Sequence, residues 1–120
     1  MTTLQVSGTG AVVLGWRQEE ERLLYSYVLS PTDLNRFYTM LMQLPFWETN
    51  TTRRSGKHEE MNIHIRVSDQ EAGTWNGVQC WHNDLDQYAT ISALLLRLYK
   101  LIGSLSDQEI PKPEWVDTID

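Results

Sequence analysis

The sequence is short of cysteine and of positive charge, and it has no long hydrophobic run. Cys80 is the single cysteine among 120 residues, so no disulfide can form within the chain, which favours a reducing compartment. Ten Lys and Arg against 16 Asp and Glu give a net charge of −6, and such a surface repels nucleic-acid phosphates. The apolar residues 91–105 are interrupted by Arg97 and Lys100 and are too few to cross a bilayer. We therefore expect a soluble, cytoplasmic protein that binds neither nucleic acid nor membrane.

Motifs for phosphate, cofactor and metal binding are also missing. The chain has no GxxxxGK[ST], and its "SGTG" at residues 7–10 lacks the following helix that a dinucleotide fingerprint requires. It has no CxxC, no HxxxH and no second cysteine that would suggest a metal site. We therefore expect no cofactor and no metal, and the sequence favours a non-enzymatic function.

What the chain does have is enough apolar material for a core. Hydrophobic residues make up 41% of the sequence and charged residues 22%, which is ordinary for a globular protein. The length is close to the commonest domain size, so we expect one domain over residues 1–106. Residues 107–120 contain two prolines and several acidic residues, which predicts a mobile or loosely packed C-terminal tail.

The first third of the chain predicts three strands followed by a helix. Alternating or β-favouring segments bounded by turn residues indicate the strands, which cover residues 2–6, 10–17 and 21–29. Ser30 is the expected N-cap of the helix, with Pro31 at its first position and Asp33 in the first turn. The apolar spacing continues the helix over residues 31–44.

The middle of the chain predicts a hairpin made of residues 59–68 and 74–82. Aliphatic residues occupy every second position of the first strand, so we expect their side chains to face the core and His64 to face away from it. On the second strand, Val78 and Cys80 are expected to face the core, so Gln79 and Trp81 face outward.

A second helix is predicted to follow, with Asn83 or Asp84 as its N-cap and Gly103 as its C-terminal cap. The fold class is therefore α+β: an antiparallel sheet of about five strands, in the order β-β-β-α-β-β-α, with two helices packed on one face. This order is similar to that of type III secretion chaperones, and the resemblance implies an acidic dimer. The chain lacks the N-terminal helix of those chaperones, and no residue motif accompanies the resemblance.

Cys80 and His82 suggest a reactive thiolate pair or, with His64 as third ligand and either Asp84 or His58 as fourth, a metal-binding centre. Strand alternation argues against it, because it places Cys80 and His64 on opposite sides of the sheet. A buried structural cysteine and a capping Asp84 are the simpler interpretations, and no residue is predicted to be catalytic.

A basic loop offers an alternative function. Four cationic residues lie close together in an otherwise acidic chain, and they are Arg53, Arg54, Lys57 and His58. Together with His64 and His82 they could bind a phosphate or carboxylate of a small molecule. A solvated surface loop is the plainer interpretation of the same residues.

The outward face of the hairpin is the most unusual feature, because tryptophans interrupt a face that should be polar. Tryptophan beside arginine is typical of a binding surface. The predicted partner-binding residues are Trp75, Trp81, His64, Arg66 and Gln79. Trp16 is expected to reach the same face. The alternative is that helix ends, the loop 45–58 or the Trp115 tail cover these tryptophans. We expect a chaperone-, adaptor- or immunity-like domain that binds a protein partner or forms a homodimer.

Overall fold

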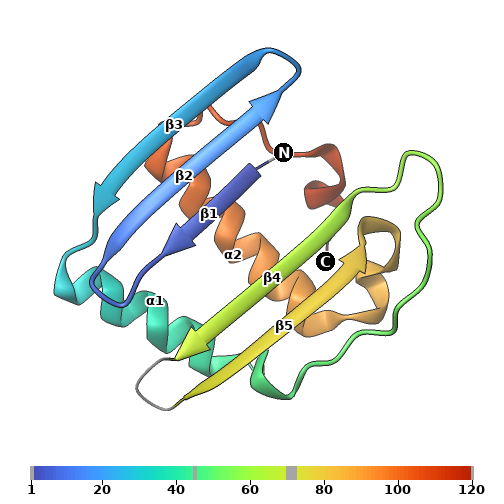
Figure 1. Ribbon diagram of the computed structural model, residues 1–120, viewed down its shortest axis with the longest axis horizontal. Helices are drawn as coiled ribbons and strands as arrows, with labels where there is room; N and C mark the ends of the chain where they lie inside the picture. Colours follow the sequence, from blue (N-terminus) through green and yellow to red (C-terminus); the bar gives the residue numbers. More distant parts are fainter. Residues whose placement is uncertain (1, 45, 70–72, 120) are drawn as a thin grey trace.

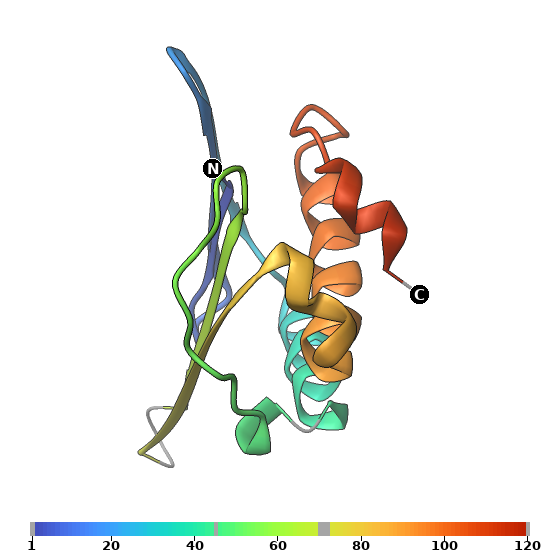
Figure 2. The same ribbon diagram turned by 90° about the vertical axis from the view of Figure 1, so that its right-hand side faces the viewer.

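The chain folds into a layer of strands packed against a layer of helices. The computed structural model describes residues 2–44, 46–69 and 73–119, and of residues 68, 69, 74 and 75 it describes the backbone only. Figure 2 shows the strands on one side and the helices on the other. One face of the strand layer is therefore covered by helices, and the opposite face, here called the outer face, is not.

The first sheet consists of three antiparallel strands, which confirms the three strands expected from the sequence. They are β1 (Thr2–Val6), β2 (Ala11–Gln18) and β3 (Glu21–Val28), in the order β1-β2-β3. Val12 and Leu14 of β2 are only 1% and 0% exposed, because they point toward the helices. Gly10 allows the turn before β2, since its φ is +90° and a Cβ would lie 2.8 Å from the Leu29 carbonyl oxygen.

The second sheet is the predicted hairpin of β4 (Asn62–Asp69) and β5 (Thr74–Trp81). Its alternation is as expected, because Ile63, Val78 and Cys80 are buried while His64 is exposed. The predicted single sheet of about five strands is wrong, since the strands form a three-stranded and a two-stranded sheet. Alternation decides which face a strand buries, but it does not decide which other strand meets its edge.

The first helix, α1 (Pro31–Gln43), begins where the sequence predicts. The backbone N–H of Asp33 donates to Ser30 Oγ at 3.1 Å, so Ser30 is the N-cap. Leu41 is buried on the side of α1 that faces the sheets. A short 3-10 helix, η1 (Phe46–Glu48), follows and buries Phe46 completely, which closes this end of the core.

The second helix starts later than the sequence predicts. Residues His82–Gln87 form a 3-10 helix, η2, and α2 spans Ala89–Leu105. The expectation that Asn83 or Asp84 caps α2 is therefore wrong, because Asp84 lies in η2 and binds Arg54 instead. Gly103 does not end α2 either. The helix ends at Leu105 with Ser106 as its C-cap, and the Ser106 hydroxyl donates to the Ile102 carbonyl at 2.7 Å.

The segment after α2 packs against the body of the protein. Ile110 is 4% exposed, and Val116, in the 3-10 helix η3 (Glu114–Thr118), is 2% exposed. The ring of Trp115 contacts Tyr99 of α2 and His82 of η2. This segment is therefore held by apolar contacts, although its composition suggests a loose tail. In the described part of the chain, no helix has the length and apolarity needed to cross a membrane.

Two clusters of buried side chains form the core. The larger lies between β4, β5 and the two helices and includes Ile63, Val78, Ile91 and Leu94. The smaller lies beneath the first sheet and consists of Leu14 of β2, Ile102 of α2 and Ile110. The core is therefore divided in the same way as the strand layer, with α2 spanning both parts (Figure 1).

Candidate functional site

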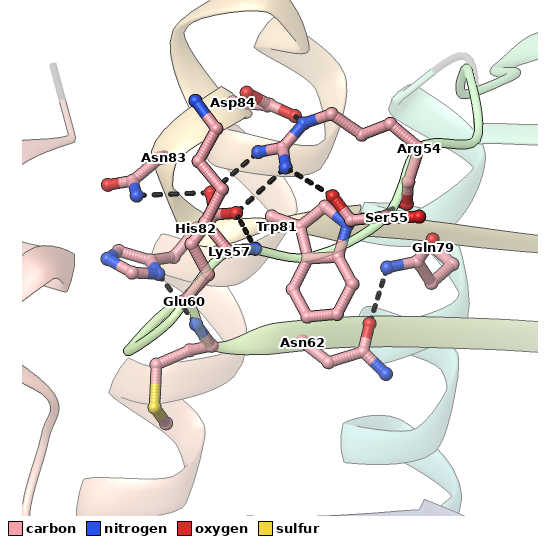
Figure 3. Close-up of polar contacts among 11 residues, drawn as sticks. Arg54, Ser55, Lys57, Glu60, Asn62, Gln79, Trp81, His82, Asn83 and Asp84 are labelled. Carbon is pink, nitrogen blue, oxygen red and sulfur yellow. Dashed lines mark hydrogen bonds and ion pairs between the residues drawn. The ribbon is translucent and has the colours of Figure 1, made fainter.

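The outer face of the β4–β5 hairpin is partly covered by the loop of residues 49–60. Trp81, at the end of β5, points to the outer side, and its indole N–H donates to the Arg54 carbonyl at 3.2 Å (Figure 3). Gly56 lies directly on the indole, because a Cβ at Gly56 would be 2.4 Å from the nearest ring carbon. Trp81 is therefore partly buried by the protein's own chain, which is one of the two alternatives that the sequence leaves open.

The same loop follows the edge of β5. The backbone N–H of Gln79 donates to Thr51 Oγ1 at 3.3 Å, and the Asn76 side chain donates to the carbonyls of Phe46 and Thr49 at 2.7 and 3.0 Å. The loop therefore contacts β5 at these two residues, and Thr51 binds the backbone N–H of Gln79 that another strand would otherwise bind.

An ion-pair cluster fixes the end of this loop, and it consists of Arg54, Glu60, Asn83 and Asp84. Arg54 binds both oxygens of Glu60 at 2.8 and 2.6 Å, and its Nε donates to Asp84 Oδ2 at 2.9 Å (Figure 3). The Asn83 side chain and the backbone N–H of Lys57 also donate to Glu60, at 3.1 and 2.7 Å. The contacts join Arg54 and Glu60 of the loop to each other and to η2.

Electrostatics in the Arg54 cluster favour its ionised state. Hydrogen bonds from Arg54 lower the pKa of Glu60 from 4.5 to about 2, and the same bonds raise the pKa of Arg54. The Glu60 side chain is only 2% exposed, so it depends on these donors in place of water. The cluster holds one cation and two carboxylates, so its own charge is unsuited to capturing an anion.

The four residues of the predicted anion site therefore have different environments. Arg54 is bound to carboxylates, and an incoming anion would have to displace them. Arg53 and Lys57 are exposed, and the His58 side chain is 95% exposed with Glu59 at 3.8 Å. No observed contact favours anion binding at this loop.

The predicted partner-binding residues also differ in exposure. His64 and Arg66 are exposed on the outer face of β4, and His64 lies opposite Gln79 in the strand register. The Gln79 side chain donates to Asn62 Oδ1 at 2.5 Å. The side chain of Trp75 lies outside the described residues.

Trp16 does not reach this face, contrary to expectation. It shares the alternation of Val12 and Leu14 and packs beneath the first sheet, in the smaller cluster with Ile102. The outer face of the described chain therefore carries Trp81 under a loop, rather than a row of open indoles.

Cys80 and His82 do not form a reactive pair. Cys80 is 3% exposed, and burial, with a smaller contribution from Asp84, raises the pKa of its thiol to about 11. His82 Nδ1 accepts a hydrogen bond from the Met61 backbone N–H at 2.9 Å, so one ring nitrogen has a structural role. Among the residues with described side chains, no group of three His, Cys, Asp or Glu is placed to hold a metal ion.

Sequence reasoning missed a different apolar surface on the outer face of the first sheet. Leu24 and Val28 of β3 are 74% and 82% exposed, and Val13 of β2 is 41% exposed. The signal was present, because β2 is apolar on both of its sides and β3 alternates Leu24, Ser26 and Val28 with inward tyrosines. Comparisons with protein-family models, curated proteins and solved structures gave no significant match.

Proposed function

We propose that this chain is a small, cytoplasmic, non-enzymatic protein-interaction domain that associates through β3 and the outer face, with a second copy of itself as the occupant. The observation that supports this proposal is the exposure of Leu24 and Val28 on a strand at the end of its sheet. Large apolar side chains that are highly exposed and lie next to one another are typical of binding surfaces.

The backbone of β3 supports the same conclusion. The N–H of Leu29 donates to the Gly10 carbonyl at 2.8 Å, which shows that odd-numbered residues of β3 bond to β2. In an antiparallel ladder, alternate residues direct their N–H and C=O groups to opposite edges. Leu24, Ser26 and Val28 therefore direct theirs to the open edge, and their side chains are the exposed ones.

The edge of β3 lacks the features that prevent pairing. Natural edge strands are usually protected by Lys, Pro or a bulge, whereas residues 23–28, "LLYSYV", contain neither residue and pair with β2 without interruption. Antiparallel pairing of two copies centred on Ser26 would place Leu24 of one copy opposite Val28 of the other. Such a contact is two-fold symmetric and closed, so it gives a dimer and not a fibre.

Solution mass at several protein concentrations tests this proposal. We expect a concentration-dependent dimer for the wild type and a monomer for the double variant Leu24→Lys/Val28→Lys, whose exposed positions tolerate the change in the monomer. Leu96→Lys, at an exposed position of α2, is the matched control and should dimerise like the wild type. A monomeric wild type at all concentrations, or an unchanged dimer in the double variant, would refute the proposed contact.

A further inference from the structure

The strand layer is interrupted between β1 and β4, at a position called here the β1–β4 break. Figure 1 shows these two strands as neighbours in the layer, further apart than the paired strands, with their arrows pointing the same way. They belong to different sheets, and no backbone hydrogen bond joins them in the described chain. Each sheet therefore ends at the break with an open strand edge.

The backbone groups at the break can be assigned from the ladders. The N–H of Ser7 donates to the Ala11 carbonyl at 2.9 Å, so odd-numbered residues of β1 bond to β2. Thr2, Leu4 and Val6 therefore direct their N–H and C=O groups to the break.

The same reasoning applies to the facing strand. The N–H of His82 donates to the Met61 carbonyl at 3.0 Å, so odd-numbered residues of β4 bond to β5. Asn62 and His64 direct their backbone groups to the break. The bond from Gln79 N–H to Thr51 supports this assignment of bonded and free residues. Gln79 lies opposite His64, and its N–H points away from β4.

The core is divided at the same place. The two clusters of buried side chains are separate, and Tyr99 of α2 is a partly buried residue that packs against both. Leu4 of β1 and Ile65 of β4 are partly buried at the border of one cluster each. The apolar side chains on the inner face of these two edge strands are therefore mostly buried but not fully covered.

We infer that an extended segment of a partner protein binds at the β1–β4 break, antiparallel to both strands. β3, β2 and β1 alternate in direction, as do β4 and β5, but β1 and β4 run the same way (Figure 1). One antiparallel guest strand restores the alternation and joins the two sheets into one. Main-chain hydrogen bonds along both of its edges would hold it, which is the β-strand addition mode of peptide recognition.

The chemistry of the guest follows from its neighbours. Side chains at every second position would face Leu4, Ile65 and Tyr99, so these positions are apolar. The intervening positions would lie beside Gln5 and His64 on the outer face, so these are polar. β1 has five residues, which sets the length of guest that pairs with both strands at about five or six residues.

We assign the occupant to another protein, because the extended segments outside the two sheets in the described residues are already engaged. The loop of residues 49–60 is bonded to β5 and to the Arg54 cluster, and the segment after α2 is packed through Ile110 and Val116. A second copy has the same segments engaged. This inference rests on the proposed role as a protein-interaction domain, but it does not depend on pairing through β3.

Selection from a displayed library of random segments of about ten residues, with the full chain as bait, tests the inference. We expect enrichment of segments that alternate apolar and polar residues. Hydrogen exchange of the complex should show new protection of the Leu4 and His64 amides, and Leu24, Ser26 and Val28 should keep the protection that they have in the unbound protein. Selected segments that protect only β3 would overturn the inference while supporting the interaction domain. No enrichment of any segment would overturn it as well.

Two variants at one position separate backbone pairing from side-chain contact. His64→Pro removes the N–H that faces the break and leaves the bonds to β5 in place, so it should weaken binding of a selected segment about tenfold or more. His64→Ala keeps the N–H and should bind like the wild type. Equal binding by both variants would contradict the inference. If His64→Pro does not fold, the hydrogen-exchange pattern of the wild type decides.

Discussion

Gly56 offers a direct test of the contact that covers Trp81. A Cβ at Gly56 would lie 2.4, 2.6 and 2.8 Å from three carbons of the indole ring. The ring cannot turn away freely, because its N–H is bonded to the Arg54 carbonyl at 3.2 Å. Gly56→Ala must therefore lift the loop from β5 or displace Trp81.

The magnitude follows from two opposing effects. Forcing an extra carbon into a packed contact costs about 1–3 kcal/mol. Replacing Gly by Ala also restricts the unfolded chain, which stabilises the fold by about 0.4–1 kcal/mol. The net expectation for Gly56→Ala is a loss of roughly 1–2 kcal/mol of unfolding free energy.

Gly8 supplies the matched control, because a Cβ there would meet no atom within 4 Å. Gly8→Ala keeps the unfolded-state effect without the clash, so it should leave the stability unchanged or slightly increased. Urea unfolding of both variants at neutral pH measures the difference, and thermal unfolding should show a shift of about 4 °C for each kcal/mol. Equal midpoints for the two variants would show that the loop does not lie on Trp81.

Two further predictions concern titratable groups. Because its pKa falls from 4.5 to about 2 on folding, Glu60 stabilises the fold above pH 4.5, and this contribution is lost as the pH falls toward 2. Glu60→Gln should therefore flatten the dependence of the urea midpoint on pH in this range, and parallel curves for variant and wild type would contradict the Arg54 cluster. Burial raises the pKa of the Cys80 thiol from 9.0 to about 11. At pH 8 the thiol should therefore react with a disulfide reagent at least about 100-fold more slowly in the native protein than in the unfolded protein. Similar rates in the two states would show that Cys80 is open to solvent.

Local patterns in the sequence were sufficient for the features that depend on neighbouring residues. The alternation in residues 61–67 predicted that Ile63 is buried and His64 exposed, because successive side chains on a strand point to opposite faces. Ser30 was identified as a cap because the bond to Asp33 spans a single turn. The same kind of reasoning failed at Asp84, which resembles a cap but binds Arg54, a residue 30 positions away.

The candidate surfaces depended on contacts that no local pattern contains. Trp81 faces outward as predicted, yet Gly56 covers it, and nothing in the spacing of residues 49–60 indicates the path of that loop. The residues that the structure leaves exposed, Leu24 and Val28, were visible as one side of an alternating strand. Only the strand order shows that this side lies at the end of a sheet without a covering helix.

The sequence by itself determined the identity of the strands, the start of α1 and the inner face of each strand, because these follow from side-chain periodicity and capping within a few residues. The tertiary structure alone decided that the strands form two sheets, that Arg54 is neutralised by Glu60 and Asp84, and that β1 and β4 face each other with the same direction. These features join segments far apart in the chain, and periodicity sets which way a side chain points but not which distant edge or charge it meets.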